Sequence, residues 1–348
     1  MDEYLTSYED IDVHALMLKD LPRTRAYCDA IQQCAGLLEG KTVLDVGAGS
    51  GILSLFAARA GARRVYAVEA SNMAHIAKEI VAANGLGDVV EVIHTAVEDV
   101  TLPVDAVDVI VSEWMGFYLL HESMLDSVIY ARDRWLRPGG LMLPSSARLH
   151  IAMCDLSDYW REEFEWTRDF FGFDMTPLVP HLKERRFREP LIMSVDERCV
   201  WRESAATVLQ LDMSKCSASE LEAFQVESRL TVCPGGNNEA RKVHGFLLWF
   251  DVGFPSVSDK EQPVVLSTAP WQPQTHWKQA RWVVIPLPEP MSVCEMVADE
   301  RAGEGGASCG AAGVRVSSAL RFVREGGSRN YTLDLEITDV QVVKGTGE

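Results

Sequence analysis

The chain has 348 residues, of which 47% are hydrophobic and 24% charged, values typical of a folded globular protein. These values argue against a disordered, collagen-like or coiled-coil chain. Lysine and arginine total 33 against 51 aspartates and glutamates, a formal charge of −18. Proteins that bind a nucleic-acid backbone usually present a basic face. We therefore expect no direct nucleic-acid ligand and favour a cationic partner; an acidic surface that serves only solubility is the alternative.

Cysteine usage and apolar runs indicate the compartment. The eight cysteines are spread along the chain and form no CxxC pair, so the sequence predicts neither a metal site nor a disulfide scaffold. We expect no secretory leader, and no run of 18 apolar residues is present to span a bilayer. We expect the protein to make no membrane contact and to lie in the cytoplasm, with the nucleus as the alternative compartment.

In chain order, the sequence divides into three segments. Residues 1–37 are rich in aromatic and helix-compatible residues, with Pro22 as the one clear break. From 38 to about 145, short β-branched runs alternate with helical stretches, as in βαβ units around a parallel sheet. The expected strands are 42–46, 64–68, 89–94 and 107–112, and the expected helices are 52–60, 73–83 and 123–136, the last closed by Pro138-Gly139-Gly140.

The third segment, 146–348, loses most of its helical periodicity. Strand-like stretches separated by polar or Gly/Pro connections predict an antiparallel sandwich or barrel. Within it, residues 160–171 are aromatic and helical, and the glycine-rich stretch 303–313 is expected to be a loop. The strand-like stretches are 148–153, 207–211, 245–252, 280–286 and 331–337.

A glycine-rich turn follows the first expected strand. Gly47-Ala48-Gly49-Ser50-Gly51 lets the backbone turn tightly and approach a ligand, and the crevice at strand ends binds nucleotides in such folds. The spacing is G-x-G-x-G, shorter than the G-x-G-x-x-G of dinucleotide enzymes. The next strand ends in Glu69, whose carboxylate can accept both ribose hydroxyls. Together these features favour a nucleoside ligand; a turn that merely needs glycines, with a solvated Glu69, is the alternative.

The segment Leu44-Asp45-Val46-Gly47-Ala48-Gly49-Ser50-Gly51 resembles the first motif of class I S-adenosylmethionine (AdoMet) methyltransferases. The resemblance implies a Rossmann-like domain at 38–145 and AdoMet as cofactor. Because AdoMet contains no pyrophosphate, no anion cradle is needed at the helix N-terminus, which agrees with the shortened glycine spacing.

Two glutamates flank the loop after the fourth strand. Glu113 and Glu122 enclose an aromatic and aliphatic stretch with one glycine, a length that brings both carboxylates back to one pocket. Two buried carboxylates repel each other, and a guanidinium between them removes the conflict because its planar fork matches paired carboxylates. The alternative is that Glu113 only ends a strand and Glu122 only stabilises the N-terminus of the following helix.

The loop Ser-Glu-Trp-Met-Gly-Phe-Tyr-Leu-Leu-His-Glu-Ser-Met-Leu at 112–125 resembles the double-glutamate loop of protein arginine N-methyltransferases. Thr275-His276-Trp277 resembles the Thr-His-Trp loop of that family, and the N-terminal stretch from Tyr4 to Thr24 resembles its substrate-covering helical segment. The similarity extends over nearly the whole chain and is closest to type I enzymes, particularly the isoform-six branch.

The resemblance implies a role for each matching residue. Glu113 and Glu122 would clamp the substrate guanidinium, and Asp20 would pair with His276 to join the N-terminal segment to the β domain. The implied catalytic residues are Glu113, Glu122 and His276; the implied cofactor-binding residues are His14, Met17, Arg23, Asp45, Gly47, Gly49, Glu69 and Glu98; and the implied substrate-pocket residues are Tyr8, Met17, Met124 and Trp277.

The same resemblance implies an α/β domain followed by a mostly-β, barrel-like domain with a helical dimerisation arm at about 166–192, and hence a homodimer. It also implies methyl transfer to arginine-rich proteins, giving monomethylarginine and asymmetric dimethylarginine. Two alternatives stay open: a small-molecule methyltransferase, which would not need both Glu113 and Glu122, and a catalytically silent scaffold that binds Arg-rich proteins.

Overall fold

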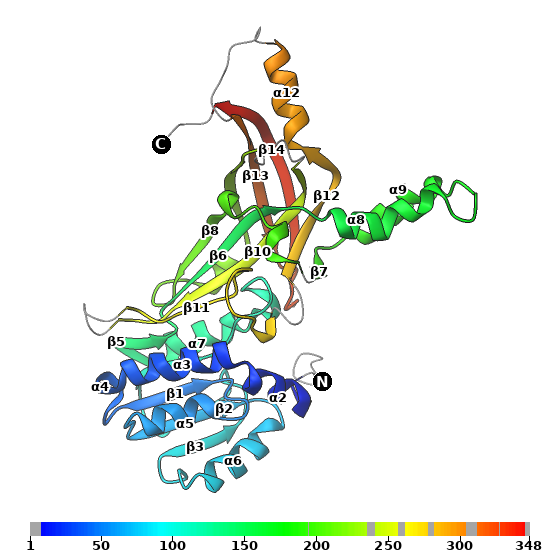
Figure 1. Cartoon of the computed structure of the whole chain (residues 1–348). Coiled ribbons are helices and arrows are strands. Elements are labelled where there is room, and N and C mark those ends of the chain that lie inside the picture. Colours follow the sequence, from blue (N-terminus) through cyan, green and yellow to red (C-terminus); the bar gives the residue numbers. More distant parts are fainter. Residues whose placement is uncertain are drawn as a thin grey trace.

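The structure is a computed structural model that describes residues 8–193, 195–234, 241–256, 262–277, 282–303, 312–326 and 328–344. A parallel-sheet domain carries the N-terminal helices, an antiparallel β domain follows it, and a helical arm projects from the side of the β domain (Figure 1). This arrangement confirms the predicted fold class.

The first helices connect the two domains. They are α2 (Ile11–Lys19), α3 (Leu21–Gln33) and α4 (Ala35–Leu38). The Asp20 carboxylate caps α3 by accepting a hydrogen bond from the Arg23 amide. Pro22 does separate two helices, but it lies in the first turn of α3, where its missing N–H costs no hydrogen bond. Because α3 contacts both α5 (Ile52–Arg59) and β11 (Val265–Ser267), it spans the domain boundary.

The parallel sheet has the strand order β3-β2-β1-β4-β5. The predicted strands appear within one residue as β1 (Thr42–Val46), β2 (Arg64–Glu69), β3 (Val90–His94) and β4 (Val107–Ser112), with α6 at Met73–Ala83. All residues of β1 are buried, as expected for a central strand of a parallel sheet. The strand order reverses between β1 and β4, and ligands of open α/β sheets bind at such a reversal, beyond the strand ends.

The segment around Pro138-Gly139-Gly140 differs from the prediction. The helix α7 (Leu125–Trp135) ends earlier, and the three residues lie inside strand β5 (Leu136–Leu143) rather than closing the helix. Strand β5 is at the edge of the sheet, where proline removes no necessary ladder bond, and its register against β4 shifts between Val107 and Val109. Tertiary position therefore overrides the local turn signal.

The second domain contains two antiparallel sheets, ordered β7-β12-β10-β6-β8, with β11 beside β10, and β14-β13-β9. The expected strands appear, although residues 280 and 281 of the expected strand 280–286 lie outside the described residues. Sequence reasoning missed β7, β9, β11 and β13. Buried residues of both sheets join one core that continues into the parallel-sheet domain. The bounds are β6 Ser146–Cys154, β7 Leu191–Met193, β8 Ala206–Asp212, α10 Ala218–Leu221, β9 Ala223–Val232, β10 Lys242–Gly253, β12 Trp282–Ser292, α12 Val293–Gly303, β13 Ala312–Val323 and β14 Thr332–Lys344.

The arm begins with α8 (Ser157–Phe164) and returns through α9 (Val179–Arg186). The predicted helix 160–171 is thus shorter and starts earlier, since a 3-10 turn, Glu165–Arg168, follows α8. Most of the predicted loop 303–313 lies outside the described residues; Gly303 ends α12 and Gly313 belongs to β13.

The described residues also bear on metal sites, cysteines and membrane contact. No group of three or more His, Cys, Asp or Glu among them is placed to hold a metal ion. The seven cysteines in the described part of the chain are free thiols. None of the described helices is both long and apolar enough to cross a membrane.

Candidate active site

A cavity of about 340 Å³ lies where the ends of β1, β2 and β4 meet the N-terminal helices and the segment Thr275-His276-Trp277. Asp45 is fully buried and does not line this cavity. The structure brings the other predicted site residues to its wall: Tyr8, His14, Met17, Arg23, Gly47, Gly49, Glu69, Glu98, Glu113, Glu122, Met124, His276 and Trp277.

The glycine turn requires glycine at two positions that line the cavity. Gly47 and Gly49 have φ values of 68° and 53°, in the left-handed region that favours glycine. A Cβ at Gly47 would lie 2.2 Å from the Met124 Cε, and one at Gly49 would lie 3.2 Å from the His14 Cε1. The bare turn therefore allows two side chains from distant segments to approach the backbone beside the cavity.

Glu69 ties the end of β2 to this turn. It is buried, its Oε2 accepts a hydrogen bond from the Gly49 amide at 2.7 Å, and its Oε1 accepts one from the Ser71 amide at 2.8 Å. A carboxylate oxygen can accept more than one hydrogen bond, so both oxygens retain capacity for hydroxyl donors in the cavity. The two backbone contacts hold the carboxylate in place.

Asp45 lies at the buried end of the same strand–turn unit. Its Oδ2 accepts a hydrogen bond from the Ser54 hydroxyl at 2.7 Å, whereas its Oδ1 has no partner among the described residues. Burial raises the Asp45 pKa to about 7, against the opposing effect of the Ser54 hydrogen bond. The unpartnered oxygen is buried and is not exposed to the cavity.

Arg23 and Glu113 form a nearly buried ion pair. The Arg23 Nε and Nη2 donate to the Glu113 Oε2 at 3.0 and 2.8 Å, and Nη1 donates to the Met17 carbonyl at 3.2 Å. The family resemblance implied a cofactor-binding role for Arg23 and a substrate-clamping role for Glu113. In the structure they contact each other, which places a cation between the glycine turn and the glutamate loop.

Glu122 is held in an uncommon backbone conformation. Its φ is 70°, and the neighbouring Leu119 and Ser123 also have positive φ values, of 72° and 52°. The Tyr8 hydroxyl donates a hydrogen bond of 2.7 Å to the Glu122 Oε2. Burial raises the Glu122 pKa, with an opposing effect from Tyr8 and a further rise from Glu113. The negative charge of Glu113 therefore acts on the Glu122 carboxylate across the cavity.

The turn between β13 and β14 supports this loop, and sequence reasoning missed it. The Ser123 hydroxyl donates to the Arg329 carbonyl at 2.7 Å, and the Arg329 Nη1 donates to the Glu122 carbonyl at 3.4 Å. The Tyr331 amide donates to the Tyr118 hydroxyl at 3.1 Å. Arg329 also lines the cavity. No short-range sequence pattern can reveal these contacts, because about 200 residues separate the partners.

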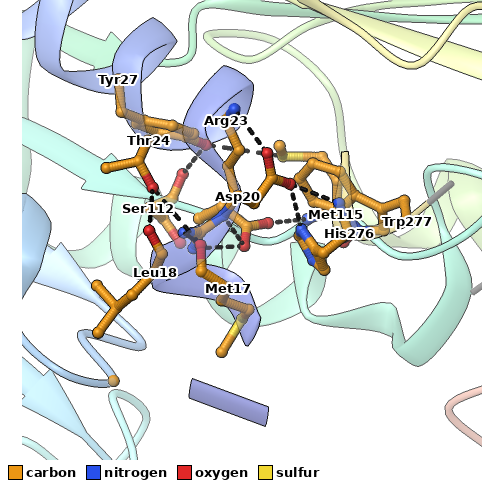
Figure 2. Close-up of polar contacts among 12 residues, drawn as sticks. Met17, Leu18, Asp20, Arg23, Thr24, Tyr27, Ser112, Met115, His276 and Trp277 are labelled. Carbon is orange, nitrogen blue, oxygen red and sulfur yellow. Dashed lines mark hydrogen bonds and ion pairs between the residues drawn. The ribbon is translucent and has the colours of Figure 1, made fainter. Parts of the chain in front are cut away.

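Asp20 and His276 join the helical segment to the β domain (Figure 2). The Asp20 Oδ2 lies 2.7 Å from both the His276 amide nitrogen and its Nδ1, and the Trp277 Nε1 donates to the Met115 carbonyl at 2.9 Å. Although burial opposes the shift, hydrogen bonds from His276 and the Arg23 amide lower the Asp20 pKa. These contacts close one side of the cavity.

The fold and the site define a class I methyltransferase. The strand order of the parallel sheet reverses between β1 and β4, and the glycine turn after β1 and the Glu69 carboxylate at the end of β2 lie on one cavity. Residues 43–140 match the family model described as a methyltransferase domain, and residues 145–295 match the arginine methyltransferase oligomerization subdomain.

Curated relatives and solved structures agree with both models. The chain is 42% identical to protein arginine N-methyltransferase 1.1 of Arabidopsis thaliana over 84% of this chain and 71% of that protein. It is also 42% identical to the probable protein arginine N-methyltransferase 6.1 of Oryza sativa subsp. japonica, over 83% of this chain and 77% of that protein. The Trypanosoma brucei PRMT1 enzyme-prozyme heterotetrameric complex with AdoHcy superposes with a TM-score of 0.75 at 31% identity, covering 97% of this chain and 100% of that chain. A structure of PRMT6-SAH superposes with a TM-score of 0.70 at 29% identity, covering 94% of this chain and 100% of that chain.

The chain belongs to the protein arginine N-methyltransferase family. It is an AdoMet-dependent enzyme that methylates arginine in proteins, and this function is favoured over a small-molecule methyltransferase or a silent scaffold. The residues present fit the cofactor, since the buried Glu69 carboxylate lines the cavity beside the glycine turn and is held there by two backbone amides, so that it presents two fixed acceptor oxygens.

Proposed function

We propose that this enzyme is of type I and forms monomethylarginine and asymmetric dimethylarginine in arginine-rich proteins. The observation that carries the proposal is the placement of Glu113 and Glu122 on one cavity with the glycine turn and two methionines, Met17 and Met124. Methyl transfer from labelled AdoMet to a Gly-Arg-rich peptide, compared with a lysine-for-arginine peptide, tests the activity. Equal labelling of both peptides would overturn it.

The two glutamates act on the charge of the substrate. A guanidinium has a pKa of ~12.5–13.8, so its deprotonation before the reaction is costly at neutral pH. Paired carboxylates instead draw positive charge onto one side of the guanidinium and align the other nitrogen for attack. Glu122 is the principal charge-localising residue, and Tyr8 holds its carboxylate. Arg23 holds Glu113 through Oε2, and among the described residues Oε1 accepts a single hydrogen bond, of 3.2 Å, from the Met115 amide.

When bound, AdoMet supplies the electrophilic methyl group on its sulfonium sulfur. The residues proposed to hold it share the turn side of the cavity. Glu69 accepts the ribose hydroxyls, and Glu98, whose Oε1 accepts a 2.6 Å hydrogen bond from Ser127, borders the adenine. Arg23 balances the carboxylate of the methionine moiety. The others are His14, Met17, Gly47 and Gly49, which line the cavity, and Asp45, which is fully buried and does not line it.

Proton release is assigned to the pair Asp20–His276. His276 lines the cavity, and its Nδ1 contacts the Asp20 carboxylate, which fixes the ring and leaves Nε2 as the atom that can accept a proton. Trp277 lines the same cavity next to His276.

Replacing Met17 with phenylalanine should lower the ratio of asymmetric dimethylarginine to monomethylarginine. Met17 and Met124 are unbranched and flexible, so they leave room for a methylated nitrogen to return towards the methyl donor, whereas a bulky ring does not. Mass spectrometry with neutral-loss fragmentation separates the isomers. A dominant symmetric product in the wild type would refute type I, and an unchanged ratio in M17F would show that Met17 is only packing.

We further propose a symmetric homodimer formed through the arm. Phe170, Phe171 and Phe173 at its tip are 46%, 87% and 69% exposed, an apolar surface too large for an isolated projection. Ion pairs of Arg186 with Glu163, at 2.9 Å, and of Lys183 with Glu289, at 2.6 Å, hold the arm in its projecting form. A second subunit of the same chain supplies the covering surface.

Light scattering at micromolar concentration should give twice the chain mass, and the double variant F171S/F173S should give a monomer of lower activity. The two serines remove apolar contacts without touching the residues that line the cavity. A fully active wild-type monomer would refute the requirement for the dimer.

A further inference from the structure

The backbone that carries Glu122 is strained. Glu122 has a φ of 70°, and Leu119 and Ser123, on either side of it, have φ values of 72° and 52°. None of the three is glycine, and other residues rarely adopt this left-handed conformation. Such a backbone persists only where its surroundings hold it. The contacts around the loop therefore decide where the Glu122 carboxylate points.

The loop itself supplies the first part of this support. Gly116 and Leu119 exchange backbone hydrogen bonds of 3.1 and 3.0 Å. A Cβ at Gly116 would lie 2.3 Å from the His121 carbonyl oxygen, so the backbone at these two positions is in close contact. These contacts close the first half of the loop, and they end one residue before Glu122.

Tyr118, in the middle of the loop, connects it to the β domain. Its side chain is buried and does not line the active-site cavity. Its hydroxyl oxygen accepts a hydrogen bond from the Tyr331 amide at 3.1 Å and lies 3.2 Å from the His121 Nδ1. Burial raises the Tyr118 pKa to about 12 and lowers the His121 pKa, so the phenol keeps its proton and the imidazole is uncharged near neutral pH. The phenol can then donate to Nδ1 while its oxygen accepts from the amide.

Two further hydrogen bonds join the loop to the same turn between β13 and β14. The Ser123 hydroxyl donates to the Arg329 carbonyl at 2.7 Å, and the Arg329 Nη1 donates to the Glu122 carbonyl at 3.4 Å. The turn is itself anchored in the β domain, where the Tyr331 hydroxyl donates to the Leu221 carbonyl at 2.7 Å. The three consecutive residues 121–123 are thus tied to one turn, either directly or through the Tyr118 hydroxyl.

We propose that Tyr118 and His121 are positioning residues for methyl transfer. Together they connect the Tyr331 amide to the residue before Glu122, and so fix the backbone end of the glutamate. The Tyr8 hydroxyl fixes its carboxylate end. Neither Tyr118 nor His121 lines the cavity, so both act through Glu122 rather than on the substrate. The alignment of the target guanidinium thereby depends on how the β domain contacts this loop. The inference rests on the proposed role of Glu122.

Replacing Tyr118 with phenylalanine tests the chain of hydrogen bonds. The ring is kept, but the Tyr331 amide loses its acceptor and the His121 Nδ1 loses its donor. For an Arg-rich peptide, kcat should fall by about tenfold because Glu122 is less well aligned. KM and the Kd of AdoHcy should change by less than about twofold, since Y118F removes no group that lines the cavity. Steady-state kinetics and calorimetry, at a folded fraction checked by thermal unfolding, measure these quantities.

The matched control is Y66F, the same change at a buried tyrosine of β2 that does not line the cavity. It should leave kcat unchanged. An equal loss of kcat in Y66F and Y118F would overturn the proposal, because the effect would then be that of any lost buried hydroxyl. An unchanged kcat in Y118F would also overturn it.

The variant E122Q separates positioning from a general loosening of the fold. Since Tyr118 acts through the Glu122 carboxylate, Y118F should cause no further loss in E122Q, whose residual methyl transfer is followed in single-turnover assays at high enzyme concentration. The same fractional loss in both backgrounds would overturn the proposal. Near-normal turnover by E122Q itself would instead refute the proposed role of Glu122, and the positioning role with it.

The second residue of the chain has its own pair of variants. The asparagine Oδ1 in H121N can take the place of Nδ1 as acceptor, whereas H121L has no acceptor. H121N should therefore keep most of kcat, and H121L should lose about as much as Y118F. If Y118F unfolds, this pair and S123A, which removes the hydrogen bond to the Arg329 carbonyl and should also lower kcat, provide the test. Equal kcat values for H121N and H121L would contradict the positioning role of His121.

Discussion

Replacing Glu122 with glutamine should lower kcat/KM for an Arg-rich peptide by about a hundredfold or more. Glutamine keeps the shape but cannot balance the guanidinium charge, and removal of one preorganised charge-stabilising group typically costs ~10²–10³-fold. AdoMet affinity should stay near the wild-type value, because Glu122 contacts Tyr8 and the Arg329 turn rather than the glycine turn. Labelled-AdoMet assays at matched cofactor occupancy measure the effect.

The matched control is E79Q, the same change on the exposed face of α6, which should leave turnover unchanged. Near-normal methylation by E122Q, with an unchanged unfolding temperature, would remove support for the glutamate clamp.

The pH profile gives a second readout of Glu122. The carboxylate must be ionised to act on the guanidinium, and burial raises its pKa in the free protein. As the pH falls, wild-type kcat/KM should therefore begin to drop above the range of an ordinary glutamate, ~4.3. Y8F removes the hydrogen bond that favours the charged form, so it should move this acidic limb to still higher pH.

Replacing Glu69 with alanine should weaken AdoHcy binding by roughly 10- to 150-fold, which corresponds to the loss of ~1.5–3 kcal/mol for a charged acceptor. The structure adds a second cause, because the Gly49 and Ser71 amides also lose their acceptor. Calorimetry on the purified variant measures the total, and unchanged affinity would contradict the assignment of Glu69.

A double-mutant cycle separates the two causes. If Glu69 accepts the ribose hydroxyls, wild type should bind 2′-deoxy-AdoHcy more weakly than AdoHcy, and E69A should bind both equally. If the carboxylate only holds the turn, E69A would weaken both ligands by the same factor and leave the ratio unchanged. E69Q, which keeps one acceptor oxygen, should fall between wild type and E69A.

The sequence alone was sufficient for the elements whose local pattern agrees with their tertiary position. Strands β1 and β4 were predicted at their observed bounds, because continuous β-branched runs suit a strand buried on both faces. The glycine turn was predictable for the same reason, since its backbone conformation depends on nearby residues. The double-glutamate loop was recognisable as a motif, and both of its carboxylates reach the cavity.

Contacts between distant segments were decided only by the tertiary structure. Pro138-Gly139-Gly140 reads locally as a helix stop, yet it belongs to a strand because an edge position tolerates proline. The pairing of Arg23 with Glu113, the Arg329 turn beneath Glu122, and the stacking of His150 on Trp249 all join residues that are far apart in the chain. Periodicity and spacing describe neighbours along the chain, whereas sheet register and domain packing bring these side chains within hydrogen-bond or stacking distance.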